Sequence, residues 1–420
     1  MNILILGSGG REHALAWAIN QNPKCDTLIC APGNAGMGDV ATCLPLDIMD
    51  GNAVVDFAQH HKIDFVVIGP EAPLAAGIAD ALRGANILCF GPSADAAQLE
   101  ASKAFTKEIC DACNAPTAAY GHFKDAGQAK AYVHGQAMPI VIKADGLAAG
   151  KGVIIAETQP EALAAIDNMF DGQFGEAGAE VVIEEFMQGE EASLFILSDG
   201  KNILPIGTAQ DHKRAYDGDK GPNTGGVGAY SPAAIMDDAV MEKAMAQIIR
   251  PTIAEMARRG TPFQGVLYAG FMIENGQPRL VEYNVRFGDP ECQAICIRLG
   301  AQMLDALLAC ANGTLDTARI NWADDHAISI VMAANGYPDA YEKGSVISGL
   351  DAADNDPKAQ IFHAGTKLVD GNITANGGRV LNITARGETL HAAHTRAYAL
   401  AKKIDWADGF YRKDIGWRAL

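Results

Sequence analysis

Short apolar runs alternate with amphipathic segments over the first hundred residues, and this alternation constrains the fold more than any other feature of the sequence. The segments between the runs, such as 11–19 and 73–82, carry apolar residues at helical spacing. The runs themselves have the length and composition of buried strands, at 2–6, 27–30, 64–68 and 87–90. Buried strands separated by helices predict a doubly wound parallel sheet of the α/β class.

Two loops follow the ends of expected strands, G-S-G-G-R-E-H-A (Gly7 to Ala14) and G-P-E-A-P (Gly69 to Pro73). Ligands of parallel sheets bind beyond the carboxyl ends of the strands, and a glycine turn before a helix favours an anion. Glu12 stands where the dinucleotide fingerprint needs a third glycine, and no carboxylate follows Cys30 to hold a ribose. A nicotinamide cofactor is therefore disfavoured. A smaller phosphorylated substrate is favoured, with a plain structural turn as the alternative.

The rest of the sequence has a different pattern of expected strands and helices. The whole chain, at 420 residues, is longer than one hydrophobic core usually supports. We expect one helix over Ala94–Cys110, a small α+β unit of short strands from Thr117 to Asp199, and a long helix over Pro232–Arg259. A hairpin turn is expected at Glu274 to Gly276. The expected domains are an α/β domain at 1–101, a domain at 102–324 whose small unit spans about 117–191, and a mixed β/α domain at 325–420.

Composition excludes several classes of function. Acidic residues outnumber basic ones by 51 to 33, a formal net charge of −18, which argues against a nucleic-acid partner. Apolar runs fall short of the roughly 18 residues that span a membrane, and the uncharged M-N-I-L-I-L does not resemble a secretory signal. Nine scattered cysteines, of which Cys110 and Cys113 lie three apart in a helical stretch, favour core packing in a reducing compartment. We therefore expect a cytoplasmic protein with small-molecule partners.

Two further segments could bind a nucleotide. In I-K-A-D-G-L-A-A-G-K-G-V (Ile142 to Val153) a glycine-rich loop with Lys143 and Lys151 joins two expected strands and could close over a triphosphate. In V-V-I-E-E-F-M-Q-G-E-E-A-S (Val181 to Ser193) a buried strand runs into carboxylates, and Glu191 could accept from ribose hydroxyls. The alternatives are a glycine hairpin with surface lysines and an acidic turn on a solvated edge.

The stretch L-V-E-Y-N-V-R-F-G-D-P-E (Leu280 to Glu291) is the most informative in the chain. Period-two alternation places Glu282, Asn284 and Arg286 on one face of an expected strand. Two oxygen ligands beside a guanidinium suit nucleotide-bound Mg²⁺ with its phosphates. A solvent-facing polar edge is the alternative.

Gln210 to Pro232 reads Q-D-H-K-R-A-Y-D-G-D-K-G-P-N-T-G-G-V-G-A-Y-S-P, rich in glycine and in both charges, with little strand or helix pattern. Loops of this length inside a compact enzyme are usually functional, and disorder is the alternative.

In this order, these elements resemble the ATP-grasp superfamily. The resemblance extends over essentially the whole chain to one family, the phosphoribosylamine–glycine ligases or glycinamide ribonucleotide synthetases. It rests on G-S-G-G-R-E-H-A, on D-H-K-R-A-Y-D-G-D-K-G-P-N-T-G-G-V-G-A-Y-S-P, on E-Y-N-V-R-F-G-D-P-E and on the terminal F-Y-R-K-D-I-G-W-R-A-L.

The resemblance implies a preATP-grasp domain, central and lid ATP-grasp domains, and an ADP-forming ligase of the second step of de novo purine (IMP) biosynthesis. ATP would phosphorylate glycine to glycyl phosphate, and 5-phosphoribosylamine would displace the phosphate, with Mg²⁺ or Mn²⁺ as the metal. The implied catalytic residues are Arg286, Asp211 and Lys213, and the metal ligands are Glu282 and Asn284. ATP would be bound by Lys103, Lys143, Gly150, Lys151, Gly152, Glu184, Glu185, Met187 and Glu191. The other substrates would meet Gly9, Gly10, Arg11, Glu12, His13, Glu71, Asn223, Thr224, Gly225, Gly226, Asp289, Pro290, Lys367 and Arg379.

One departure from the superfamily leaves the number of metal ions open: many ATP-grasp enzymes carry a metal-binding glutamate where this chain has Gly270. A monomer or weak homodimer is expected. The competing hypotheses are a biotin carboxylase-like enzyme and a non-catalytic nucleotide-binding regulator. The former is disfavoured by the missing M-K-M signal, and the latter by the presence of Glu282, Asn284, Arg286, Lys103 and Lys143.

Overall fold

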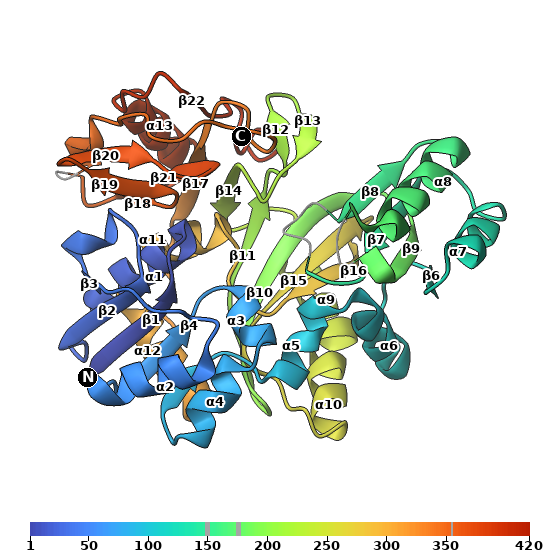
Figure 1. The fold of residues 1–420 in the computed structure, drawn as a ribbon, viewed down its shortest axis with the longest axis horizontal. Coiled ribbons are helices and arrows are strands. Elements are labelled where there is room, and N and C mark those ends of the chain that lie inside the picture. The colour runs from blue at the N-terminus through green and yellow to red at the C-terminus, as the bar shows by residue number, and fades with distance from the viewer. Residues whose placement is uncertain (148–151, 174–177, 354–355) are drawn as a thin grey trace.

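The computed structural model describes residues 1–147, 152–173, 178–353 and 356–420 and folds them around three larger sheets (Figure 1). The first is an all-parallel sheet in the order β3-β2-β1-β4-β5, which confirms the expected class of the N-terminal region. Its strands are β1 (Asn2–Gly7), β2 (Thr27–Pro32), β3 (Thr42–Cys43), β4 (Phe65–Ile68) and β5 (Leu88–Phe90). Its helices are α1 (Gly10–Asn20), α2 (Gly51–His60), α3 (Glu71–Ala75) and α4 (Ile78–Gly84).

Side-chain alternation along β1 explains why helices cover both faces of this sheet. Ile3 and Ile5 share a buried cluster with Leu15 of α1, whereas Leu4 and Leu6 lie in a second cluster with helices α2 and α4. Because α1 starts directly after β1, its N-terminus stands at the carboxyl edge of the sheet, where ligands of such sheets bind.

The single helix expected over Ala94–Cys110 is wrong, because two helices, α5 (Ala94–Ala101) and α6 (Lys103–Cys113), divide the segment at Ser102. Ser102 has an extended backbone, and its Oγ accepts a hydrogen bond from the N–H of Phe105 at 3.0 Å, which caps α6. The same hydroxyl donates to the Asp145 carboxylate. The break therefore places the first turn of α6 beside the loop that follows β7 (Ile140–Ala144).

A small four-stranded sheet, β6-β9-β7-β8, lies to one side of the molecule (Figure 1). It contains β6 (Tyr120–Phe123), β8 (Val153–Ala156) and β9 (Val181–Glu185), with helices α7 (Ala126–Val133) and α8 (Gln159–Asn168) and a π-helical turn at Met169–Gln173. The expectation that the strand run up to Asp199 forms one unit is wrong for its last strand. That strand, β10 (Glu190–Asp199), pairs with the central strands β11 and β15, so Glu191 lies in the central sheet.

The largest sheet runs β16-β15-β10-β11-β14-β17-β21-β18, and β22 pairs with β17. Its strands are β11 (Ile203–Asp211), β14 (Gly228–Ser231), β15 (Gln264–Glu274), β16 (Gln277–Asn284), β17 (His326–Ala334), β18 (Ala359–His363), β21 (Arg379–Gly387) and β22 (Gly409–Phe410). The hairpin turn expected at Glu274 to Gly276 joins β15 to β16. Pairing of β14 with β17 makes the C-terminal strands an extension of the central sheet.

The segment 210–232 is more regular than the sequence indicates, because it holds the hairpin β12 (Arg214–Tyr216) and β13 (Lys220–Asn223) as well as β14. A second hairpin is formed by β19 (Thr366–Val369) and β20 (Asn372–Ala375). Short 3₁₀ turns lie at Met37–Asp39 and Leu350–Ala353.

The long helix expected from Pro232 starts later, at Asp238, because Asp237 caps it by accepting from the N–H of Val240. It runs through α9 (Asp238–Ala244), a π-helical turn at Met245–Ile249 and α10 (Arg250–Arg258). The other helices are α11 (Glu291–Leu299), α12 (Gln302–Ala311) and α13 (Leu390–Ala401). In the described part of the chain no single helix has the length and apolarity to cross a membrane. The α11 and α12 pair meets that test only when combined across a 107° bend.

Candidate active site

The two N-terminal loops meet at Glu12, as expected from their place at the sheet edge. Its Oε2 accepts from the N–H of Gly9 at 2.6 Å, and its Oε1 accepts from Nε of Arg11 at 2.6 Å. A Cβ at Gly69 would lie 2.3 Å from Glu12 Oε1, so that position has room only for glycine. Glu12 is thus bonded within the first loop and packs against Gly69 of the second.

Glu71 lies between two guanidinium groups. Its Oε2 is 4.0 Å from Nη2 of Arg11 and 3.3 Å from Nε of Arg286. Burial raises the pKa of Glu71, but Arg286 and Arg11 outweigh it, so the net pKa lies below its ordinary value. The carboxylate thus links the first loop to the segment that follows β16.

Arg286 is also held by Glu100 of α5, a residue that the sequence analysis missed. Nη2 of Arg286 is 3.0 Å from Glu100 Oε1, and Glu100 Oε2 accepts from the N–H of Val285 at 2.7 Å. Burial alone would lower the pKa of Arg286, but Glu100 and Glu71 raise it, so the guanidinium stays charged. Its Nε faces Glu71 Oε2 at 3.3 Å, so Glu71 and Glu100 hold the guanidinium between them.

Lysines from α6 and β7 converge on Glu184 of β9. Lys143 Nζ is 2.8 Å and Lys107 Nζ is 3.2 Å from the Glu184 carboxylate. Lys103 Nζ donates to the carbonyl of Gly146 at 3.1 Å, and burial lowers its pKa although Glu282 opposes the shift. Lys107 was not predicted, yet it follows Lys103 by four residues, which is one helical turn.

The metal ligands implied by the resemblance lie at the end of β16. Asn284 Oδ1 accepts from Nη2 of Arg286 at 3.1 Å, and Glu282 pairs in register with Gly270 of β15. Burial raises the pKa of Glu282, but nearby cations lower it by more, so the net pKa lies below its ordinary value. These cations are Lys213, Lys143, Lys103 and Arg286. A carboxylate that stays anionic and an amide oxygen are ligands that fit Mg²⁺ or Mn²⁺. A Cβ at Gly270 would stand 3.6 Å from Glu282 Cγ, an ordinary contact distance.

Lys213 connects the segment after β11 to β10. Its Nζ is 2.6 Å from Glu191 Oε2, and its carbonyl accepts from both the N–H and Oγ1 of Thr224, each at 2.8 Å. Oγ1 of Thr224 accepts from the N–H of Gly226 at 3.0 Å. Burial raises the pKa of Asp211 to about 7, opposed by Lys213 and reinforced by Glu291. The structure thus brings Asp211, Lys213 and the 223–226 turn together.

Arg379 closes the other side of this turn. Its Nη1 donates to the carbonyls of Gly225 at 2.6 Å and Gly226 at 3.2 Å, and also to the carbonyl of Asp289. Asp289 in turn accepts from the N–H of Arg11 at 3.0 Å. A Cβ at Gly226 would lie 2.8 Å from Pro290 Cδ, so Pro290 packs directly against the turn. Asp289 therefore connects the first loop, through Arg11, with Arg379 of β21.

Other residues implied by the resemblance lie at the margins of this arrangement. His13 is buried, and its Nδ1 accepts from the N–H of His363 at 2.8 Å. A Cβ at Gly10 would lie 2.2 Å from Asn382 Nδ2, so this glycine allows a close approach to β21. Lys367 lies exposed on β19.

The expected adenine contacts lie where β9 ends. The N–H of Glu185 donates to the carbonyl of Ala119 at 2.9 Å, its carboxylate pairs with Arg279, and Met187 is buried. Gly152 is buried and its carbonyl accepts from the N–H of Ala144 at 2.8 Å. Gly150 and Lys151 lie outside the described residues.

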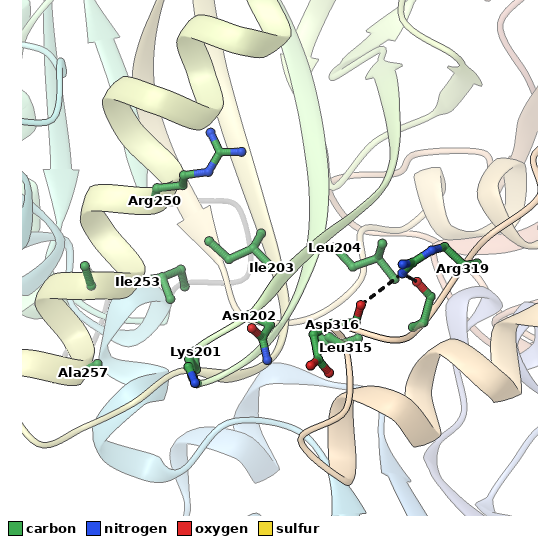
Figure 2. A pocket seen from close by; sticks show the side chains of 13 residues that line it. Lys201, Asn202, Ile203, Leu204, Arg250, Ile253, Ala257, Leu315, Asp316 and Arg319 are labelled. Carbon is green, nitrogen blue, oxygen red and sulfur yellow. Dashed lines mark hydrogen bonds between the residues drawn. The ribbon is translucent and has the colours of Figure 1, made fainter.

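A groove of about 740 Å³ contains none of these residues. It lies between α10, the β10–β11 turn and the segment after α12, and Arg250, Lys201 and Arg319 line it (Figure 2). Arg319 donates to the carbonyl of Asp316 at 3.1 Å, and Figure 2 shows Arg250 and Lys201 pointing away from each other. Because these cations do not converge, the motif residues and not this groove form the candidate site.

Models of one protein family match most of the chain. Residues 1–100 match Phosphoribosylglycinamide synthetase, N domain, residues 101–292 match its ATP-grasp (A) domain, and residues 327–418 match its C domain. Two bacterial relatives, both named phosphoribosylamine–glycine ligase, are similar over their full length. The one from Agrobacterium fabrum is 58% identical over 100% of this chain and 99% of its own. The one from Escherichia coli O157:H7 is 49% identical with the same coverage.

Solved structures agree with this match. The crystal structure of a phosphoribosylamine–glycine ligase from Thermotoga maritima has a TM-score of 0.87 and 32% identity, over 99% of this chain and 100% of that one. A biotin carboxylase–beta-gamma-ATP complex from Campylobacter jejuni has a TM-score of 0.74 at 14% identity, over 98% of this chain and 92% of that one. The second likeness shows a shared fold alone.

Proposed function

The chain belongs to the phosphoribosylglycinamide synthetase family, and from this premise we propose that it joins glycine to 5-phosphoribosylamine through a glycyl phosphate intermediate. The overall reaction consumes ATP and gives glycinamide ribonucleotide, ADP and phosphate, the second step of de novo purine biosynthesis. The enzyme is an ADP-forming carbon–nitrogen ligase.

The observation that carries the proposal is the set of four cations around Glu282. Lys103, Lys143, Lys213 and Arg286 all lower the pKa of this carboxylate, although they come from four different segments of the chain. Bringing a carboxylate substrate to an anionic γ-phosphate requires such a cluster, because the two reactants repel one another. Arg286, one of these cations, is held in place by Glu71 and Glu100.

In the first step a carboxylate oxygen of glycine attacks the γ-phosphorus of ATP, and the bond from that phosphorus to the bridging oxygen breaks to release ADP. Lys103 and Lys143 hold the phosphates. Arg286, fixed by Glu71 and Glu100, stabilises the charge on the transferring phosphoryl group. Asp211 and Lys213, with the 223–226 turn, hold glycine.

In the second step the amine nitrogen of phosphoribosylamine attacks the acyl carbon, and the bond from carbon to the phosphate oxygen breaks. The amine loses a proton and phosphate leaves. Gly9 to His13 and Glu71 hold phosphoribosylamine, and Asp289 and Pro290 lie next to that site and to the glycine turn. Arg379 and Lys367 are the candidate cations for its phosphate.

The proposal also assigns residues to the adenosine part of ATP and to the metal. Glu184, Glu185, Met187 and Glu191 line the adenosine part of ATP. Glu282 and Asn284 hold Mg²⁺ or Mn²⁺, which when bound neutralises phosphate charge and orients the γ-phosphate.

We further propose that residues 1–101, 102–324 and 325–420 act as three domains, with about 117–191 as a lid over ATP. The enzyme works in the cytoplasm as a monomer or weak homodimer. Its nine cysteines are all free thiols, which suits a reducing compartment.

The decisive experiment is phosphate release by the purified protein with ATP and Mg²⁺. Glycine is supplied with and without phosphoribosylamine, which is generated in place from ammonia and ribose 5-phosphate. Release that requires both substrates supports the proposal. ATP binding without release under any of these conditions contradicts it and favours a nucleotide-binding regulator.

A further inference from the structure

The C-terminal segment 410–420 has a part that the proposed reaction does not use. Its Arg412 side chain is fully buried, a rare position for an arginine. Both ends of its guanidinium are engaged. Nε and Nη2 donate to the two oxygens of Asp414 at 2.7 and 2.8 Å, and Nη1 donates to the carbonyl of Arg214 at 3.0 Å and to Asp219 Oδ1 at 2.9 Å.

Both outside partners of Arg412 belong to the β12–β13 hairpin. Arg214 is the first residue of β12, and Asp219 stands in the turn before β13 with a φ of 55°. A single guanidinium therefore fixes one strand of the hairpin and its turn at once.

Residues that follow Arg412 form hydrogen bonds to the same hairpin and to His212, which lies just before it. The N–H of Lys413 donates to Asp217 Oδ1 at 2.8 Å, and Asp414 Oδ2 accepts from the N–H of Gly218 at 2.8 Å. The N–H of Gly416 donates to Nε2 of His212 at 3.2 Å. These contacts join residues that are about two hundred positions apart in sequence, so the hairpin is held by the C-terminus and not by its own two short strands alone.

The base of the hairpin is in direct contact with the proposed glycine site. Arg214 pairs with Asn223 at its base, and directly beside that pair the carbonyl of Lys213 accepts the two hydrogen bonds from Thr224. His212 lies between Asp211 and Lys213 and has backbone hydrogen bonds to Gly228 and Val227. A shift of the hairpin would therefore move Lys213 and the 223–226 turn together.

We propose that Arg412 is a positioning residue for the glycine site: through Arg214 and Asp219 it sets the hairpin that aligns Lys213 with the 223–226 turn. This inference rests on the proposed assignment of glycine to that turn. Only the planar fork of arginine can reach Asp414 in a bidentate way and bond the hairpin with its remaining nitrogen, so lysine cannot replace it.

The test compares Arg412→Met and Arg412→Lys with the matched control Arg396→Met. Arg396 also pairs with an aspartate, Asp356, and donates to a backbone carbonyl, that of Arg386, but not in the hairpin. We expect both Arg412 variants to raise the KM for glycine about tenfold while the KM for ATP changes less than about twofold. The control leaves both KM values at the wild-type level.

A second measurement does not depend on the reaction. Trypsin cleavage after Lys220, an exposed residue of β13, is followed by mass spectrometry of the intact chain. We expect cleavage to be faster in both Arg412 variants and unchanged in the control. If the wild type shows no glycine-dependent turnover, the proposed function fails while this readout still tests the hairpin.

Two results would overturn the proposal. One is an unchanged rate of cleavage after Lys220 in both Arg412 variants. The other is a glycine KM that stays at the wild-type value or rises only in parallel with the ATP KM. If Arg412→Met does not fold, Arg412→Lys alone decides by the same two criteria.

Discussion

The Glu100 carboxylate holds Arg286 by its side chain and by its backbone neighbour: Oε1 lies 3.0 Å from Nη2 of Arg286 and Oε2 accepts the N–H of Val285. Glu100 belongs to α5, whereas Arg286 follows β16 of the central sheet. The cation proposed to steady the transferring phosphoryl group is thus fixed by a helix from another part of the chain.

We expect Glu100→Gln to lower kcat about tenfold with the KM for ATP changed less than about twofold, because the amide keeps only one acceptor oxygen and cannot neutralise the buried guanidinium. Steady-state phosphate release measures both constants. Glu108→Gln on the exposed side of α6 is the matched control. A kcat for Glu100→Gln equal to that of the control would show that Arg286 does not need this partner.

We expect Glu282→Ala to lower turnover about a hundredfold or more, because the variant loses the carboxylate assigned to the metal. Phosphate release is titrated with Mg²⁺ and Mn²⁺. Glu274→Ala, at the exposed end of β15, serves as control and should leave the titration unchanged. Full activity of Glu282→Ala at the same metal concentration would remove Glu282 from the metal site.

The expected pH dependence comes from His363, which lies against His13. Burial lowers the pKa of His363 to about 4 from an ordinary value of 6.5. The unfolded chain therefore takes up a proton below pH 6.5 that the folded chain does not, and stability is lost as the pH falls from 6.5 towards 4. Relative to His363→Asn, the wild type should lose about 2 kcal/mol of unfolding free energy between about pH 7.5 and pH 5.

Urea unfolding at the two pH values measures this loss. The comparison with the variant is needed because Asp211, whose pKa burial raises to about 7, contributes in the opposite direction. Equal pH dependence of the wild type and His363→Asn would show that His363 titrates normally in the folded chain.

Local patterns in the sequence were enough to predict the parallel N-terminal sheet, the β15–β16 hairpin and the face shared by Glu282 and Asn284. Alternation and turn residues report these features directly. The break at Ser102 had a local signal, the serine that caps α6, but the contact of its hydroxyl with Asp145 in the loop after β7 could not be read from the sequence. The position of β10 in the central sheet likewise depends on pairing with β15, which no periodicity reveals.

The residues of the candidate site also divide into those that sequence patterns predict and those that only the fold reveals. Arg286, Lys143 and Glu282 were predicted, as were Glu71 and Glu184, which pair with the first two, but Glu100 and Lys107 were not. Glu100 and Lys107 lie on helices whose sequence resembles any amphipathic surface, and only the fold turns them inward. Lys107 alone had a usable signal, its spacing of one helical turn from Lys103.

The last prediction concerns the two candidate cations for the phosphate of phosphoribosylamine. Arg379 already uses Nη1 to hold the carbonyls of Gly225 and Gly226 next to Asp289, whereas Lys367 lies exposed on β19. We expect Arg379→Met to raise the apparent KM for phosphoribosylamine about tenfold and Lys367→Met to raise it less than about threefold, because a cation fixed by several contacts binds phosphate with less loss of side-chain entropy. Ribose 5-phosphate is titrated in excess ammonia, with Lys402→Met as control.

Since Arg379 also braces the glycine turn, its variant should raise the KM for glycine as well, which Lys367→Met should not. A larger effect of Lys367→Met on the phosphoribosylamine KM would move the phosphate to the β19–β20 hairpin and leave Arg379 as a brace for the turn alone.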